Sequence, residues 1–260
     1  MLASPTAVLR TAACCLVLML AGCATTGEPS PGDPWEPANR KVYALNDGID
    51  RATLKPVAKV YEKHTPKWIR NSVSNFFNNL DTPITVVNQL LQGKLLEAAQ
   101  DTLRFAMNTT LGIGGLFDPA TDANLPRHDE DLGQTLGRWG VPPGPYLMLP
   151  LLGPSNLRDV PSHVVNRFLE PFYWYDYGAE RWISLAVSLV DLRAKLLPLD
   201  PTLERTYDPY AFIREAYQQR RLFQVYDGDV PEELLPQDEE VPEDEPEAPE
   251  ADAEAPPQPD

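Results

Sequence analysis

Prolines and glycines divide the central part of this chain into short segments, and this division limits the regular structure that it can form. Residues 23–227 contain 19 prolines, which is about twice the average usage. Between these breaks, apolar side chains recur every three or four positions, as they do on one face of a helix. No stretch shows the sustained alternation of apolar and polar residues that is typical of strands. The sequence therefore predicts an all-α fold of short amphipathic helices joined by Pro/Gly-rich loops.

Six apolar stripes mark the predicted helices, and prolines or glycines stand between them. In chain order the stripes cover residues 68–80, 84–91, 95–111, 164–169, 182–197 and 211–223. Asp208 and Pro209, just before the last stripe, have the residue types of a helix N-cap and a first-turn proline. A stripe of this kind either faces a soluble core or lies in a lipid interface, and its spacing alone does not separate the two.

The first 22 residues have the features of a lipoprotein signal peptide. The apolar run over residues 11–21 is too short to span a bilayer comfortably. It ends in Leu20-Ala21-Gly22-Cys23, where small residues suit the cleavage site and the Cys23 thiol is the group that takes lipid. An ordinary secretory signal with a chance cysteine is the alternative. We expect Cys23 to carry the acyl chains of the anchor, among them palmitate. Aspartate after the lipidated cysteine is the usual signal for retention in the inner membrane, so Ala24 at this position favours export to the outer membrane.

Both ends of the mature chain are polar and rich in proline. Residues 23–34 indicate a lipidated tether and residues 228–260 a disordered acidic tail, which leaves 35–227 as the helical domain. The tail accounts for most of the net charge of −16, because residues 229–260 contain 14 acidic residues and no Lys or Arg. The remainder lacks the basic excess that nucleic-acid binding requires, so no nucleic-acid partner is expected.

Two segments favour a membrane setting. Residues 139–157 contain no charge, five prolines and three glycines, so they do not form a regular helix. Because unpaired backbone groups are unfavourable in lipid, we expect this segment to pack against the protein's own helices or to line a cavity. Residues 172–177 contain five aromatic residues, a residue type that concentrates where a membrane meets water. A core aromatic cluster is the alternative reading of that segment.

The sequence contains none of the common catalytic motifs: no GxSxG elbow, no phosphate-binding GxxxxGK[ST] loop and no HExxH. His64, His128 and His163 are isolated from one another in the sequence. For the acidic run that starts at His128, a solvated charge run is favoured over a metal site. Residues 112–115 follow a predicted helix, which argues against a dinucleotide-binding loop. We therefore predict a protein that is not an enzyme, with no catalytic residue, metal or cofactor.

Three motifs occur in order along the chain. The first comprises Asp33, Pro34, Glu36, Asn39, Arg40, Tyr43 and Asn46. The second comprises Gly133, Leu136, Gly137, Gly144, Pro145, Tyr146, Pro150, Gly153, Arg158 and Asp159. The third comprises Asp208, Pro209, Tyr210, Arg214, Glu215 and Tyr217. Together they run from about residue 33 to residue 223, and in this order the chain resembles the MlaA lipoprotein family, also called VacJ.

This resemblance implies an all-α ring around a central amphipathic channel, embedded in the outer membrane from its periplasmic side. Proteins of that family associate with trimeric porins. They extract phospholipid that is misplaced in the outer leaflet and pass it to a soluble periplasmic carrier, which maintains lipid asymmetry without covalent chemistry. The expected partners are therefore phospholipid, a trimeric outer-membrane porin and a periplasmic lipid-carrier protein.

Candidate channel or lipid contacts are Tyr146, Leu147, Met148, Leu149 and Arg181. The first four belong to the charge-free segment, which we expect to form a gate or a channel wall. Arg181 lies in a segment that departs from the family's better-known members, as does the long acidic tail. Two alternatives stay open from the residues: a periplasmic lipid-modifying enzyme and an envelope-stabilising structural lipoprotein.

The helical spacing of the first motif makes a local prediction. Asn39, Tyr43 and Asn46 share one helix face because they are separated by four and three residues. We expect this face to pack against the ring and not to contact the substrate.

Overall fold

The structure of the protein is a computed structural model, and it describes residues 32–169 and 179–235. The described part is mostly helical, as the sequence predicts. In chain order its elements are α2 (Glu36–Ile49), a π-helical turn (Asp50–Leu54), α3 (Lys55–His64), α4 (Lys67–Gln92), α5 (Leu95–Thr110), α6 (Pro119–Asp122), α7 (Leu132–Arg138), β1 (Tyr146–Leu149), β2 (Gly153–Asn156), α8 (Val160–Leu169), α9 (Ala179–Leu196), a 3₁₀ turn (Leu197–Leu199), α10 (Asp200–Arg205), α11 (Pro209–Val225) and a second 3₁₀ turn (Glu232–Leu234).

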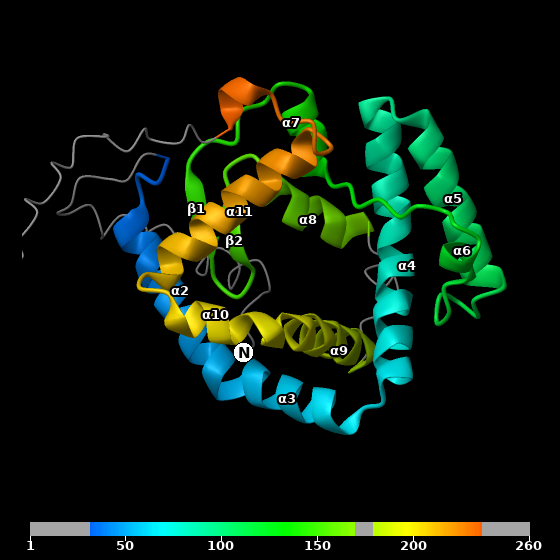
Figure 1. Ribbon diagram of the computed structural model, residues 1–260, viewed down its shortest axis with the longest axis horizontal. Helices are drawn as coiled ribbons and strands as arrows, with labels where there is room; N and C mark the ends of the chain where they lie inside the picture. The colour runs from blue at the N-terminus through cyan, green and yellow to red at the C-terminus, as the bar shows by residue number, and fades with distance from the viewer. Residues whose placement is uncertain (1–31, 170–178, 236–260) are drawn as a thin grey trace, which may run out of the picture.

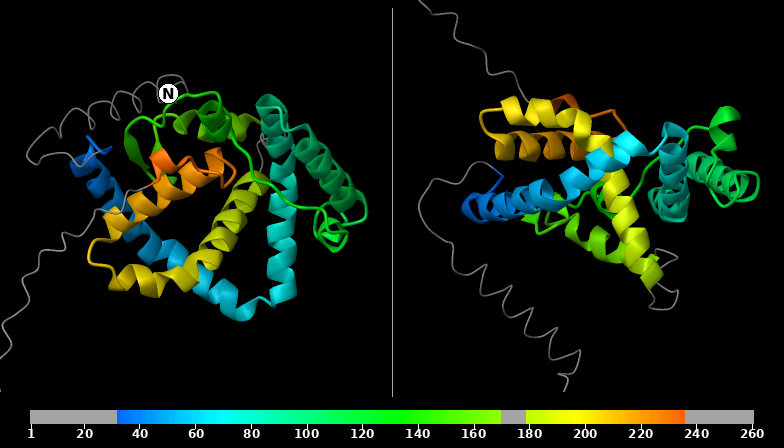
Figure 2. Two further views of the ribbon diagram at one scale, coloured as in Figure 1. Left: turned by 45° about the horizontal axis from the view of Figure 1, so that its top comes forward. Right: turned by 90° about the horizontal axis from the view of Figure 1, so that it is seen from below.

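These elements contact one another in a closed circuit, which gives the ring seen in Figure 1. Helix α3 contacts α9, α9 contacts α4, and α4 contacts α7. Helix α7 contacts α11, which contacts β2, and β1 returns the circuit to α2, which continues into α3. Seen from the edge of the ring in Figure 2, α10 and α11 lie on one side of α2 and α8 lies on the other.

Helix α4 corrects one expectation, because two predicted helices form a single one. The apolar stripes on either side of Pro83 belong to one 26-residue helix with that proline inside it. An interior proline removes a backbone hydrogen bond and disfavours a helix by about 3 kcal/mol. Packing offsets this term, since α4 contacts α9, α5 and α7 along its length. Local composition predicted a break that these tertiary contacts override.

Two helix boundaries that the sequence indicates are confirmed. Helix α4 ends at Gly93, whose φ of +79° is the left-handed conformation that favours glycine at this position. Helix α11 begins with Pro209, and the Asp208 side chain accepts a hydrogen bond from the Ala211 N–H. These ends depend on the chemistry of a few neighbouring residues, which is why the sequence predicts them well.

The charge-free segment contains the small sheet, which the sequence did not predict. β1 and β2 pair antiparallel, with Tyr146 opposite Asn156 and Leu149 opposite Gly153. Each strand has only four residues, too few for a recognisable alternation. The two strands contact α2 and α11, and at the turn between them Leu151 is 70% exposed and Leu152 is 61% exposed. The Leu151 N–H donates to the Asn46 side chain, so this turn has a backbone partner while its leucine side chains are exposed.

One small apolar cluster holds the hairpin to the helices around it. It consists of buried Tyr146, Met148 and Tyr210, with α2 and α11 residues packed against it. The rings of Tyr146 and Tyr210 meet edge to face, with their centroids 6.1 Å apart. This cluster lies where the first, second and third motifs meet.

Candidate functional site

The interior of the described structure is mainly polar. Nineteen buried residues are polar or charged, and only nine are hydrophobic, four of which are alanines. Soluble domains reverse this balance, because apolar burial is their main source of stability. Stability here depends to an unusual extent on hydrogen bonds and ion pairs inside the ring.

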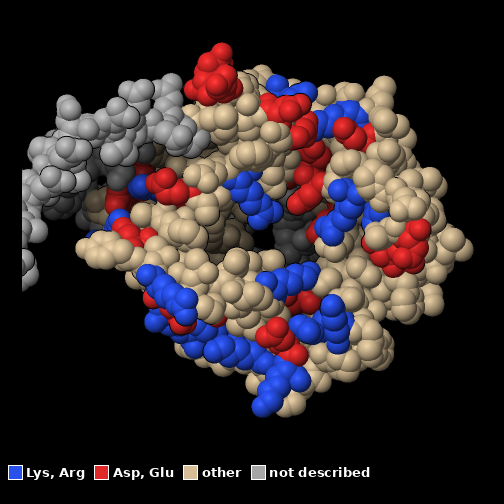
Figure 3. Space-filling view, in the orientation of Figure 1, with Lys and Arg blue, Asp and Glu red and all other residues tan. Residues whose placement is uncertain are grey.

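One part of the outer surface is apolar. Exposed large hydrophobic residues gather where α4 meets α5 and continue along α5 and the loop that follows it. They are Val87, Leu90, Leu91, Leu95, Leu96, Leu103, Leu111, Ile113, Leu116 and Phe117. Much of the edge over α5 carries no charge in the space-filling view (Figure 3). Contiguous apolar surface of this kind marks an interaction with protein or membrane.

The described tryptophans follow the same trend. Trp35, Trp68, Trp139 and Trp182 are all exposed. Tryptophan is enriched at membrane–water interfaces, where its ring is apolar and its N–H still finds a partner. None of the described helices combines the length and the apolarity that crossing a bilayer requires.

The first motif holds the hairpin through asparagine side chains. Asn39 Nδ2 donates to the Tyr146 carbonyl at 3.1 Å, and its Oδ1 accepts from the Met148 N–H at 2.9 Å. Asn46, seven residues further along α2, makes the same pair of contacts. Its Nδ2 donates to the Leu149 carbonyl at 2.9 Å, and its Oδ1 accepts from the Leu151 N–H at 2.8 Å. Two side-chain amides from α2 thus supply what a third strand would supply to the free edge of β1. This face contacts the ring wall, and Tyr43 between the two asparagines is half-buried.

Asp33 is fully buried, although it lies in the segment expected to be a tether. Its carboxylate accepts hydrogen bonds from Asn39 and from the Tyr210 hydroxyl. Arg214 lies 3.6 Å from the same carboxylate and also pairs with Glu36 and Glu215. The first and third motifs, far apart in the sequence, therefore meet around one buried acid. Pro34 beside it is exposed.

Arg40 and Asp208 form a second link between these motifs. Two hydrogen bonds of 3.0 and 2.6 Å join the guanidinium to the carboxylate, and the guanidinium also lies 4.4 Å from the centre of the Tyr210 ring. The hydrogen bond from Arg40 lowers the pKa of Asp208 to about 2. A depressed carboxyl pKa stabilises the fold above the ordinary pKa, and this contribution is lost as pH falls through the depressed value.

We expect Asp208→Asn to remove part of the acid sensitivity of the fold. Asparagine caps a helix as well as aspartate, so the variant loses the ion pair and keeps the cap. Because both side chains are a third or more exposed, the loss at pH 7 is about 1 kcal/mol or less. Urea unfolding measured between pH 7 and pH 2 should show the variant and the wild type converging below about pH 4. A constant difference down to pH 2, or the same convergence in Asp229→Asn, would contradict this reading.

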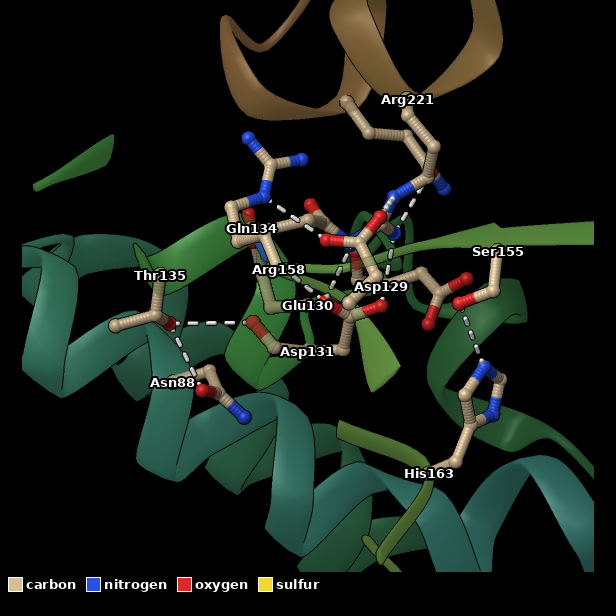
Figure 4. A network of polar contacts seen from close by, with 12 residues as sticks. Asn88, Asp129, Glu130, Asp131, Gln134, Thr135, Ser155, Arg158, His163 and Arg221 are labelled. Atoms are coloured by element: carbon tan, nitrogen blue, oxygen red, sulfur yellow. Dashed lines mark hydrogen bonds and ion pairs between the residues drawn. The ribbon is translucent and has the colours of Figure 1, made fainter. Parts of the chain in front are cut away.

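A buried ion network joins the second motif to α11 (Figure 4). Asp159 accepts from Arg221 at 2.7 Å, from Arg158 at 2.9 Å and from the Tyr217 hydroxyl at 2.7 Å. Arg221 also forms a two-point pair with Asp131, the residue that caps α7. Burial alone would raise the pKa of Asp159, but the two arginines and Tyr217 outweigh it and lower the pKa. Arg221 was missed by sequence reasoning, although it continues the spacing of Tyr210, Arg214 and Tyr217.

The glycines of the second motif make room for this network. A Cβ added at Gly133 would lie 2.3 Å from Asp159 Oδ1, and one added at Gly137 would lie 2.7 Å from Arg158 Nη1. Gly144, just before β1, and Gly153, at the start of β2, have φ values of +67° and +84°. At the remaining positions of the motif, Leu136 and Pro145 are half-buried and Pro150 is exposed.

Polar contacts continue along the inner face of α4. Thr135 donates to Asn88 at 2.8 Å, and Gln89 donates to buried Asp101 at 2.7 Å. His128 Nδ1 lies 2.7 Å from the same Asp101 carboxylate, within hydrogen-bond distance of it. Within the described ranges, no group of three or more potential metal-ligating side chains comes together.

One serine–histidine contact bears on the enzyme alternative. Ser155 Oγ lies 3.4 Å from His163 Nε2, a long separation for a hydrogen bond (Figure 4). Ser155 has no exposed surface, and the nearby Asp159 carboxylate is already bound by Arg158, Arg221 and Tyr217. A nucleophile needs access to substrate and a base held by a free partner. This arrangement offers neither.

One polar cavity of the described structure has a volume of about 780 Å³. It lies between α4, α9 and the segment around α6, and its lining consists of Asn71, Ser74, Asn75, Asn78, Asp118, Thr121, Asp122, Arg127 and Lys195. A second cavity of about 20 Å³ shares Asn75, Asn78, Asp118 and Arg127 with it and lies against Asn79. The volume of the larger cavity falls in the range of small-molecule sites.

None of the expected channel contacts lines this cavity. Tyr146 and Met148 are buried in the apolar cluster, where they contact protein, and Leu147 and Leu149 are half-buried on the other face of β1. The expectation of lipid contact is therefore corrected for Tyr146 and Met148, because β1 turns them toward α11. The side chain of Arg181, the expected lipidation site Cys23 and residues 172–177 lie outside what the structure describes.

Comparison with known proteins agrees with this architecture. The family model described as "MlaA lipoprotein" matches residues 31–224. The chain is 37% identical over 228 residues to the Escherichia coli (strain K12) "Intermembrane phospholipid transport system lipoprotein MlaA", covering 85% of this chain and 88% of that protein. It is 40% identical over 191 residues to a Rickettsia felis protein, covering 73% of this chain and 76% of the relative.

A solved structure is similar as well. It is described by the words "Structural basis for maintenance of bacterial outer membrane lipid asymmetry". Its TM-score is 0.67 at 37% identity, and the match covers 74% of this chain and 98% of that one. Since the family model spans most of the chain and the curated relatives exceed 30% identity over most of their length, this chain belongs to the MlaA lipoprotein family.

Proposed function

We propose that this chain is an outer-membrane lipoprotein, anchored through Cys23 on the periplasmic face, that removes mislocalised phospholipid from the outer leaflet. The lipid passes through the amphipathic interior of the ring to a periplasmic carrier, and a trimeric porin holds the ring in the membrane. No covalent step is part of this function. The curated relative's printed name, which refers to intermembrane phospholipid transport, supports the proposal.

The observation that carries this proposal is the inverted polarity of the ring. Polar and charged residues dominate its buried positions, and apolar residues dominate the exposed edge over α4 and α5. A phospholipid has a charged head and apolar tails, so its path needs polar and apolar surface side by side. Immersion of the apolar edge in a leaflet would remove that edge from water, at about 25 cal/mol for each Å² buried.

Membrane binding without the acyl anchor tests the immersion. The chain that begins at residue 24 should still float with phospholipid vesicles, because Leu95, Leu96 and their neighbours bind lipid directly. Leu96→Asp should weaken this binding by about tenfold or more, since burying one leucine contributes about 1.5–3 kcal/mol. Gln219→Asp, on the polar exposed face of α11, should bind as the wild type does. A monomer that remains in water without vesicles would contradict the immersion.

Transport is tested in cells that lack their own copy of the gene. The full-length chain should restore low outer-leaflet phospholipid, and the purified protein should carry intact phospholipid. The Ser155→Ala and His163→Ala variants should restore low outer-leaflet phospholipid as well as the wild type does if no covalent chemistry is involved. Release of fatty acid or lysophospholipid that depends on Ser155 would instead favour the lipid-modifying enzyme, and unchanged leaflet composition with bound lipid absent would favour a structural lipoprotein.

A further inference from the structure

The polar cavity between α4, α9 and α6 is open to solvent at Asn71, Asp122 and Arg127, which are exposed, and several of its side chains make no internal bond. Asn71, Asn75 and Asn78 lie at successive turns on one face of α4. Within the ranges that the structure describes, these three amides form no side-chain hydrogen bond. The buried amides of the same helix behave differently, since the side chains of Asn79, Asn88 and Gln89 each donate a hydrogen bond. The cavity therefore presents three free amides, each with donors and an acceptor.

Two free charges of opposite sign border the same cavity. Arg127 and Asp122 line it, and neither takes part in an ion pair or hydrogen bond among the described residues. The other charges there are already paired: Asp118 with Arg104 at 2.9 Å, and Lys195 with Asp191 at 2.9 Å. The unpaired charges of the site are thus one cation and one anion, carried by the end of α6 and by the loop that follows it, and the amides of α4 line the same cavity.

The smaller cavity extends this site inward. Asn79 lines it, and the Oδ1 atom of this 5% exposed residue is a buried acceptor without a partner in the described structure. An unpaired buried acceptor is unfavourable unless a donor reaches it. The site as a whole thus has a guanidinium for an anion, a carboxylate for a cation and amide groups for neutral oxygens.

We propose that this cavity binds the headgroup of a zwitterionic phospholipid of the phosphoethanolamine type. Arg127 would hold the phosphate by paired N–H donors, and Asp122 would accept from the ammonium group. Asn71, Asn75 and Asn78 would donate to phosphate and ester oxygens. This inference rests on the proposed transport function and adds its headgroup class.

The surroundings of the cavity suit a lipid whose tails leave the site. Helices α4 and α9, which line it, also border the central hollow of the ring, and Lys and Arg side chains lie around that hollow (Figure 3). Free phosphate shares the anionic half of this chemistry and lacks the ammonium. A site for phosphate alone would have no use for the unpaired carboxylate of Asp122.

The test measures lipid bound to the full-length, acylated protein in detergent after exposure to equimolar phosphatidylethanolamine and phosphatidylglycerol. Mass spectrometry should find the wild type enriched in phosphatidylethanolamine. Asp122→Asn should bind similar total lipid and lose the enrichment. Arg127→Gln should lower total lipid by about tenfold, as expected for a lost hydrogen bond to a charged group. Arg205→Gln and Asp229→Asn, at exposed positions elsewhere, should match the wild type.

The possible failures are distinguishable. If the wild type holds lipid but Arg127→Gln and Asp122→Asn change neither its amount nor its composition, the headgroup site is wrong and the transport function stands. If inorganic phosphate in excess displaces the lipid, and binds alone with the same dependence on Arg127 and none on Asp122, the ligand is phosphate. If the wild type holds no lipid, the transport proposal itself fails. Thermal unfolding should be unchanged in both variants, because neither side chain bonds within the described fold.

Discussion

Asp159→Asn is expected to destabilise the protein by about 3–5 kcal/mol. The substitution removes the charge that Arg221 and Arg158 share, in a site that is almost closed to water. Arg221 keeps its pair with Asp131, but Arg158 is left without a carboxylate partner among the described residues. Removing one partner of a buried ion pair has an effect of this size because the other partner remains charged and unpaired. Domains of this kind have a total free energy of unfolding of about 5–15 kcal/mol, so the loss is a large fraction of it. Urea or thermal unfolding in detergent measures the difference.

Asp47→Asn is the matched control. Asp47 pairs with Arg51 at 2.9 Å on α2, but both side chains are exposed enough for water to screen them. Exposed pairs of this type contribute about 0–1 kcal/mol. Equal effects of the two substitutions would mean that the network of Figure 4 does not hold α7, β2 and α11 together.

Gly133→Ala is expected to destabilise the protein by about 3 kcal/mol, although alanine is the better helix former. The new Cβ would lie 2.3 Å from Asp159 Oδ1 and 2.6 Å from Arg221 Nη2. Neither atom can retreat freely, since each belongs to the ion network. Overpacking typically destabilises by 1–3 kcal/mol, and displacing paired charges places this case at about the upper end.

Gly48→Ala separates the clash from the general effect of alanine. Gly48 is also helical, and a Cβ there meets nothing within 4 Å. Replacing glycine by alanine in an open helical position should stabilise the protein by about 0.5–1 kcal/mol. Opposite signs for the two substitutions are the expected result, and a stabilising Gly133→Ala would show that the network has room to shift.

The sequence predicted the features that depend on neighbouring residues. Gly93 and the Asp208-Pro209 pair set helix ends through local backbone conformation and capping, and both ends are where the residues indicate. The spacing of Asn39, Tyr43 and Asn46 placed these residues on one face of a helix for the same reason. Motif order also identified the family, because it is a property of the chain and needs no structure.

The sequence did not predict features that depend on distant partners. Pro83 breaks a helix locally, yet α4 continues through it because α5, α7 and α9 hold both halves. Four-residue strands carry too little pattern to recognise, and the side-chain amides of Asn39 and Asn46 stabilise β1 from 107 and 103 residues away. Arg221 belongs to the candidate network because the fold places it beside Asp131 and Asp159, which are 90 and 62 residues away in the sequence.

The same division explains why the polar cavity was missed. Asn71, Asn75 and Asn78 have a helical spacing that is visible in the sequence, but a polar stripe is usually the face that meets water. The sequence by itself determined that α4 has one polar and one apolar face, because side-chain chemistry and the 3.6-residue period are local. Only the tertiary structure decided that the polar face borders a cavity, because that depends on where the folded chain places α6 and α9 relative to α4.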